Sequence, residues 1–237
     1  PDGTKVYDRQ INQSEFEIKL RYAPNETFTQ SKWNRRSMKP EHPVFTLSHS
    51  ISQKGILGSD YTIHHTEASY RQRLWVSMFG YLDVIAKGGK IWNQAPYPLM
   101  IIPNANLSYT IREESFELMT PMEFVLDSHA TWDISYYMNG LIFNRTPLLK
   151  KLNFREVITF KGVWGSTMDC NIPNTNNSGN IYLYPENVIA TRMSDPYMEI
   201  GFGIENIFKF GRIDYYRRLT YKDTPGVSTQ GIRIAVH

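Results

Sequence analysis

The sequence predicts an all-β chain that forms an antiparallel transmembrane β-barrel segment of about nine strands. Several segments alternate strictly between apolar and polar residues, which is the period of a β-strand with two unlike faces. Most of these segments reach the roughly 9–11 residues that a tilted strand needs to cross a bilayer. The connections between them are either very short or very long, as in transmembrane barrels.

The first predicted strand, residues 14–23, shows the alternation clearly. In "EFEIKLRY" every second residue is charged and the residues between them are apolar. No long segment shows a helical period, so the remaining elements are also predicted as strands. In chain order, the later strands are predicted at 43–52, 59–76, 79–92, 129–139, 155–165, 197–205, 209–221 and 230–237.

The segment "MEIGFGIENIFKFGRIDYYRRLTY" (198–221) carries an apolar stripe and a charged stripe with almost no turn between two strands. In a soluble sandwich the charged stripe faces water, whereas in a barrel it faces a polar lumen and the apolar stripe faces lipid. Strand length, unequal connections and charges of both signs on the polar face favour the barrel. The residues predicted to face lipid are Ile200, Phe202, Ile204, Ile232 and Ile234.

The connections divide into two kinds. Residues 77–81 and 205–208 are nearly turnless, whereas 93–128 and 166–196 are long and rich in Pro, Asn and Ser. The connection 24–41 is an exception, because it is long on the side expected to carry short turns. The stretch "APYPLMIIPNANLSY" in 93–128 is too apolar for an exposed loop, and its prolines reduce the entropy lost on ordering. We therefore expect 93–128 to pack into the lumen or across its mouth.

Composition excludes several classes of protein. The 237 residues carry a net charge of +3, so the charge total alone does not indicate nucleic-acid binding. The mixed aromatic and basic stretches "KWNRR" and "YYRR" are interpreted as headgroup anchors or lumen charge. A single cysteine, Cys170, excludes an intrachain disulfide framework. The absence of an apolar run of about 18 residues excludes a transmembrane helix.

A search for catalytic and metal-binding motifs predicts none. His64 and His65 lie within one strand, so their side chains point to opposite faces, which is poor metal geometry. The carboxylates of "REESFE", Glu113, Glu114 and Glu117, are interpreted as a solvated loop rather than an acid–base pair. No G-x-S-x-G, P-loop or C-x-x-C motif occurs. The chain is therefore expected to be no enzyme and to use no cofactor or metal.

Several stretches carry a family resemblance. "RYAPNETF", "YPLMIIPNANLSYTIREESFELMTPMEF", "RTPLLKKLNFREVITFKGVWG" and "IENIFKFGRIDYYRRLTY" resemble a large uncharacterised outer-membrane family of Gram-negative bacteria. Its members carry a carboxypeptidase-regulatory-like domain before a barrel, and the barrel is distantly similar to the BamA-type assembly and secretion barrels. The resemblance spans nearly the whole chain. It implies that residues 1–237 are the C-terminal segment of a barrel of about sixteen strands, whose upstream strands and periplasmic domain this chain lacks.

The resemblance also implies a latch. In the assembly barrels, an external loop between the eleventh and twelfth strands folds back into the lumen and carries a Val-Arg-Gly-Phe-like motif. Counting strands backwards, 93–128 is that loop, and its "YTIREESF" supplies Arg112 without a following glycine. The resemblance places Arg112 near a lumen carboxylate such as Asp133 or Glu199. The alternative is an exposed loop arginine.

The expected function follows from the resemblance. It is an outer-membrane barrel involved in the assembly, export or anchoring of envelope proteins, located in the bacterial outer membrane. The expected partners are the lipid bilayer, lipopolysaccharide and other outer-membrane or periplasmic proteins, and no nucleic acid. One alternative is a structural barrel subunit of a larger envelope complex. Another is a soluble β-sandwich of the capsid or adhesin kind, which would not depend on detergent.

Overall fold

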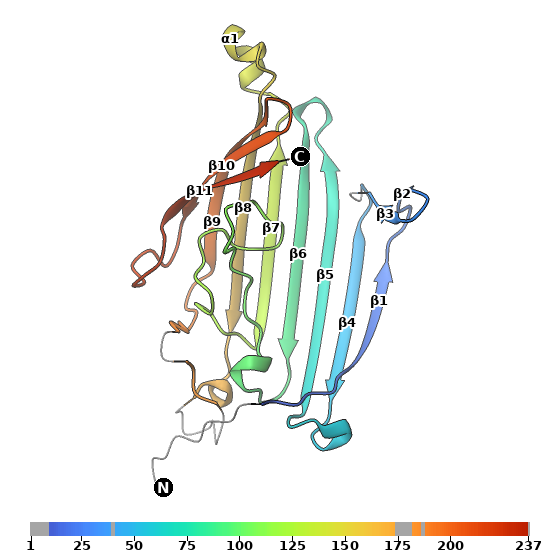
Figure 1. Ribbon diagram of the computed structural model, residues 1–237, viewed down its shortest axis with the longest axis vertical. Helices are drawn as coiled ribbons and strands as arrows, with labels where there is room; N and C mark the ends of the chain where they lie inside the picture. Colours follow the sequence, from blue (N-terminus) through green and yellow to red (C-terminus); the bar gives the residue numbers. More distant parts are fainter. Residues whose placement is uncertain (1–9, 39–40, 174–181, 186–187, 237) are drawn as a thin grey trace.

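The computed structural model describes residues 10–38, 41–173, 182–185 and 188–236, and β-strands dominate this part of the chain. Nine strands form one sheet in which every neighbouring pair is antiparallel (Figure 1). In order across the sheet they are β1 (Phe16–Tyr22), β4 (Val44–Ser52), β5 (Ile63–Trp75), β6 (Tyr81–Ile91), β7 (Ser128–Tyr137), β8 (Arg155–Ser166), β9 (Tyr197–Ile207), β10 (Gly211–Arg218) and β11 (Gln230–Val236). The nine predicted strands and their antiparallel pairing are confirmed.

The remaining elements are short. They are the hairpin strands β2 (Phe28–Gln30) and β3 (Arg35–Ser37), the helix α1 (Pro147–Lys150), and the 3-10 turns Ile56–Gly58, Ser77–Phe79, Tyr97–Leu99, Phe143–Arg145 and Asp169–Asn171. Within the described ranges, no helix is both long and apolar enough to cross a membrane.

Three predicted details differ from the structure. The connection 24–41 contains the β2–β3 hairpin, which the sequence did not predict. Strand β5 begins at Ile63 rather than at 59, and the turn predicted at 205–208 lies at 208–210, because β9 continues to Ile207. The last residue of the predicted strand 230–237, like residues 1–9 of the predicted barrel segment, lies outside the described residues.

Because each strand reverses the direction of the one before it, the connections alternate between two ends of the sheet. Segments 92–127 and 167–196 leave at one end, together with 53–62 and 219–229. The tight turns 76–80 and 208–210 lie at the other end, which also carries α1 and the β2–β3 hairpin (Figure 1). The two longest connections therefore share one end, as expected.

The turn 76–80 depends on a glycine. Gly80 has φ 103° and ψ −146°, a conformation that side chains rarely adopt. A Cβ on Gly80 would also collide with the backbone carbonyl oxygen of Tyr137 on β7. The turn therefore closes β5 onto β6 only with glycine at this position.

We expect Gly80→Ala to lower the free energy of unfolding by about 1–3 kcal/mol, because the strained backbone and the collision both oppose the turn. Denaturant unfolding measures the change. Gly88→Ala is the matched control, since a Cβ there would meet only the His129 carbonyl oxygen at an ordinary 3.5 Å. Equal losses in the two variants would contradict this account of the turn.

Residues that pair directly across neighbouring strands lie on the same face of the sheet, so the register assigns every side chain to one of two faces. We call the face that contacts residues 93–127 the inner face and the opposite one the outer face. One row of the inner face crosses six strands and consists of Arg71, Ile85, Asp133, Lys161, Glu199 and Arg218. From Asp133 onward, negative and positive side chains alternate along this row. One row of the outer face is continuous and apolar: Leu74, Leu82, Tyr136, Ile158, Phe202, Tyr215 and Ile232.

In a water-soluble protein the apolar face of a sheet is buried and the charged face is exposed. Here the burial is reversed, because the charged inner face is buried and the apolar outer face is exposed. Glu199, Asp214 and Arg218 on the inner face are 0 % exposed, whereas Phe16 on the outer face is 68 % exposed and Ile232 is 62 % exposed. Charged residues are almost never fully buried unless they are paired. The inner face must therefore supply partners for its charges, and the outer face lacks a cover within the described residues.

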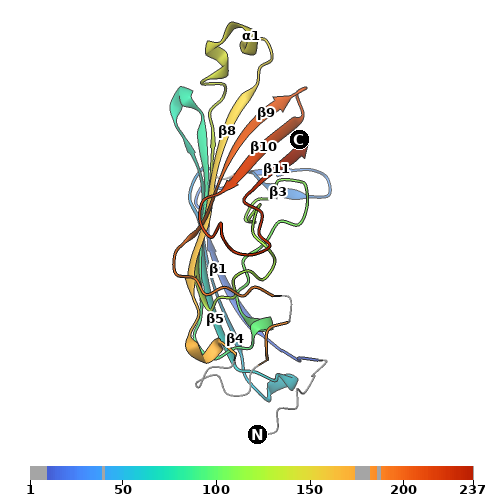
Figure 2. The ribbon, with the colours of Figure 1, turned by 90° about the vertical axis from the view of Figure 1, so that its left-hand side faces the viewer.

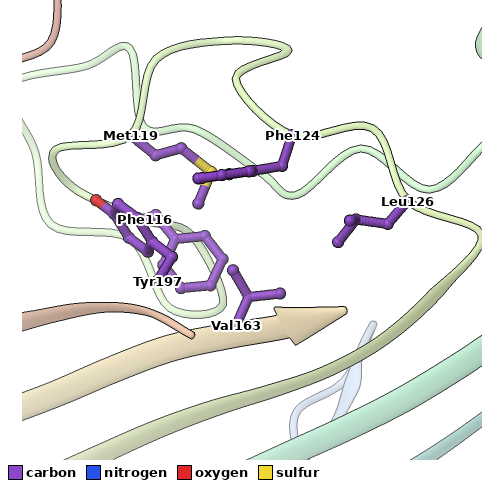
Figure 3. Packing of buried hydrophobic residues seen from close by; sticks show 6 residues of the cluster. All are labelled: Phe116, Met119, Phe124, Leu126, Val163 and Tyr197. Carbon is purple, nitrogen blue, oxygen red and sulfur yellow. The ribbon is translucent and has the colours of Figure 1, made fainter. Parts of the chain in front are cut away.

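The inner face is covered by the segment 93–127, which we call the inner loop (Figure 2). One apolar cluster joins four loop residues to Val163 and Tyr197 of the sheet (Figure 3). A second cluster joins Ala95, Met100 and Val125 of the loop to residues of β5 and β6. This connection is therefore ordered and packs against the sheet, and the expectation that it lies in a barrel lumen or across its mouth stays a prediction.

Candidate functional site

The inner loop is fastened to the sheet by three carboxylates, each of which meets cations of the inner face. Glu114 pairs with Arg71 of β5 and Lys87 of β6. The other two carboxylates, Glu117 and Glu123, reach β8, β10 and β11. The basic partners thus come from five strands, so the loop bridges most of the width of the sheet.

Lys161 of β8 is the central cation of this arrangement. Its ammonium donates to the carbonyl oxygens of Arg112 (2.9 Å) and Ser115 (2.8 Å) and to Glu117 Oε1 (3.0 Å). These three bonds use all three of its protons. Asp133 Oδ2 lies 3.7 Å from the same nitrogen. Because Lys161 is only 2 % exposed, these partners replace the water that its charge would otherwise need.

Two carboxylates of the sheet hold the loop backbone. Glu199 of β9 accepts hydrogen bonds from the backbone N–H groups of Glu117 (2.8 Å) and Leu118 (3.1 Å). It also accepts one from the hydroxyl of Tyr197 (3.0 Å). Asp133 accepts the N–H of Glu114 at 3.1 Å. Both the loop and the sheet therefore contribute carboxylates. Those of the sheet accept hydrogen bonds from the loop backbone, and those of the loop pair with cations of the sheet.

The C-terminal part of the inner loop is held by an ion pair that is fully shielded from water. The guanidinium of Arg218 on β10 faces the carboxylate of Glu123 as a two-pronged pair, and both side chains are 0 % exposed. Arg218 also donates to the carbonyl oxygen of Thr220 at 2.9 Å. Planar bidentate pairing of this kind fixes orientation as well as charge.

The loop also touches the free edge of β11. Ile111 N–H donates to the carbonyl oxygen of Ile234 at 2.9 Å, and Ile234 N–H donates to that of Tyr109 at 2.9 Å. Arg233 of the same strand forms an ion pair with Glu117 at 3.3 Å. The inner loop therefore contacts the last strand through its backbone and through a side chain.

The structure brings together two of the three residues of the expected latch. Asp133 and Glu199 both hold the loop, and they lie on either side of Lys161 in the register. The side chain of Arg112 is exposed, and only its backbone takes part. The cation between the two carboxylates is thus Lys161 rather than the Arg112 guanidinium.

One further interpretation is corrected. The carboxylates of "REESFE" do not form a solvated loop: Glu117 is only 1 % exposed and Glu114 is paired, while Glu113 alone remains exposed. Lys161 itself was missed. It is the one charged residue in the apolar run "VITFKGVWG", and this signal marks a buried, partnered charge.

A cavity of about 390 Å³ lies between the inner loop and β5 to β8. Charged groups of both signs line it, including Lys87, Asp133 and Lys161, together with His65 and His129. His64 lies on the outer face, so the prediction that the two adjacent histidines point to opposite faces is confirmed. No group of three or more metal-ligating side chains is found among the residues that the structure describes.

Comparison with protein families finds a match over most of the chain. The model for the C-terminal domain of DUF5686, a family of unknown function, matches residues 6–169. The chain belongs to this family. No curated protein matches the chain.

The matched region of the DUF5686 domain includes most of the polar contacts between the inner loop and the sheet, which we call the clamp. It contains the whole inner loop, with Glu114, Glu117 and Glu123, and also Lys161. Arg218 and Arg233 lie beyond the match. The DUF5686 region thus includes both sides of the Lys161–Glu117 pair, whereas the contacts to β10 and β11 extend outside it.

Proposed function

We propose that this chain is part of a transmembrane β-barrel of the bacterial outer membrane whose lumen is filled by the inner loop. The observation that carries the proposal is the reversed burial of the two faces. A bilayer would cover the apolar outer face, and a polar lumen suits the charged inner face. A β-sheet in lipid must also satisfy its edges, which a closed barrel achieves.

On this proposal, the residues that face lipid are Ile200, Phe202, Ile204, Ile232 and Ile234. Phe202, Ile204, Ile232 and Ile234 are exposed, and Ile200 is half-exposed. The end that carries the long connections faces the outside of the cell, and the tight turns face the periplasm. The partners are the bilayer, lipopolysaccharide and other outer-membrane or periplasmic proteins.

Within this class, the resemblance to assembly and secretion barrels supports a role in the assembly, export or anchoring of envelope proteins. A structural barrel subunit of a larger envelope complex is the second candidate. The clamped inner loop favours both roles over an open diffusion pore, because it occupies the inner face with buried ion pairs.

Two experiments test the proposal. The test molecule is the full chain, by which we mean residues 1–237 together with the upstream strands that the resemblance implies, because only these complete the barrel. Refolded with phospholipid vesicles, it is expected to float with them and to resist extraction with urea. A chain that stays in solution without detergent would instead support a soluble sandwich. Depletion of the protein from cells, followed by an envelope proteome, separates the two roles: an assembly role predicts loss of other envelope proteins, and a structural role predicts that their levels are kept.

A further inference from the structure

A polar cluster interrupts the outer face near the end where the long connections leave. It consists of His49 on β4, His64 and Thr66 on β5, Lys90 on β6, and Trp92, which follows β6. His49, Thr66 and Lys90 are paired in register, so their side chains share the outer face. We call these five residues the Lys90 cluster.

The side chains of the Lys90 cluster are held in place by one another. Thr66 Oγ1 accepts a hydrogen bond from Trp92 Nε1 at 2.9 Å and lies 2.8 Å from His49 Nδ1. Lys90 Nζ lies 4.8 Å from the centre of the Trp92 ring, and the rings of His49 and His64 stack. The cluster is therefore an ordered arrangement rather than a set of separate surface residues.

The strands around the Lys90 cluster carry no opposing charge on the outer face. None of the described outward-facing residues of β1 and β4 to β7 is a carboxylate. The acids of these strands, such as Glu67 and Asp133, lie on the inner face. An ammonium that shares one face of the sheet with two imidazoles suits a phosphate, which accepts charge-assisted hydrogen bonds.

An apolar groove of about 640 Å³ begins directly beside the cluster. Its floor is made of small residues, Ala68, Ala86 and Gly88, and its walls include Leu47 and Tyr70. Ala68 and Gly88 form the next outward-facing pair after Thr66 and Lys90 along the strands. The groove is therefore a continuation of the cluster into the apolar part of the outer face.

We propose that the Lys90 cluster and this groove form a binding site for an anionic lipid. The phosphate of the headgroup contacts Lys90 and the two histidines, and one acyl chain lies in the groove over Gly88. This inference rests on the proposed function, because acyl chains reach the outer face only if it faces a bilayer.

The test uses the full chain, delipidated in detergent micelles, with dioleoyl phosphatidylglycerol or dioleoyl phosphatidylcholine added in equal amounts. Native mass spectrometry measures the lipid retained. We expect Lys90→Gln to reduce phosphatidylglycerol retention about tenfold and to leave phosphatidylcholine unchanged, since it removes a charge-assisted contact. Gly88→Leu, which fills the groove, is expected to reduce retention of phosphatidylglycerol as well. Lys151→Gln removes an exposed charge at the opposite end and is expected to change neither.

Three outcomes overturn the inference. They are equal retention of both lipids, loss of phosphatidylglycerol from Lys151→Gln to the same extent as from Lys90→Gln, and displacement of the lipid by inorganic phosphate alone. Vesicle flotation separates this inference from the proposed function. A chain that does not float refutes both, whereas a chain that floats but shows no preference for the anionic lipid refutes only the site.

Discussion

Replacing Lys161 with methionine is expected to lower the free energy of unfolding by about 3–5 kcal/mol and to release the inner loop, because it breaks a buried ion pair on one side. Methionine keeps an unbranched apolar side chain, one atom shorter than that of lysine, and removes the charge. The carbonyl oxygen of Ser115 would lose its Lys161 donor, and that of Arg112 would keep only the Ser115 hydroxyl. Glu117 would keep only Arg233 as a cationic partner. The loop would then be held by its apolar clusters, by the ion pairs of Glu114 and Glu123 and by Glu199.

Limited proteolysis and denaturant unfolding of the full chain measure this effect. Cleavage within 104–123 is expected to become faster in Lys161→Met. Lys151→Met is the matched control, because Lys151 is exposed in the connection between β7 and β8. Unchanged protection of the loop in Lys161→Met would show that the ion pair does not hold it.

Phe202→Arg is the second change with a large expected effect. Phe202 is 51 % exposed on the outer face, between Ile158 and Tyr215. At such a half-exposed site in a water-soluble protein, an arginine would change stability by no more than about 0.5 kcal/mol. If the outer face meets lipid near the bilayer midplane, the same change costs about 2–4 kcal/mol.

Unfolding of the full chain from vesicles measures this cost. The control is Phe208→Arg, because Phe208 is 83 % exposed in the turn after β9, beyond the apolar rows of the outer face. The proposal expects a large loss for the first variant and little change for the second. Equal tolerance of both variants would exclude lipid at Phe202.

The strands could be predicted from the sequence because a period of two is a local property. Neighbouring residues alone assign Glu199 and Ile200 to opposite faces, and the structure agrees. Which of the two faces is buried is not local, since it depends on what covers the sheet. The hairpin β2–β3 was missed for a different reason: its strands have only three residues each, too few to show a period.

The contacts of the clamp could be predicted only in part. Glu199 and Asp133 were found because they lie on the polar face of clear strands. The partner of Glu117 was not, because Lys161 is 44 residues away and Arg233 is 116 residues away. Pairs at such separations are decided by the register of several strands together, which no single segment encodes. Resemblance pointed to Arg112, but the structure uses its carbonyl oxygen.

These separations have a consequence for the order in which the chain folds. Neighbouring strands of the sheet can pair early in folding, since each follows the previous one in the sequence. The inner loop precedes its partners, because Glu117 and Glu123 are made before Arg218 and Arg233, from which they are separated by about a hundred residues. Contacts of such high contact order form slowly, because the entropy of closing a long loop must be lost first. We therefore expect the inner loop to dock last. Until the final strand is in place, the carboxylates of the loop and their cationic partners on the inner face stay accessible to water or to a chaperone.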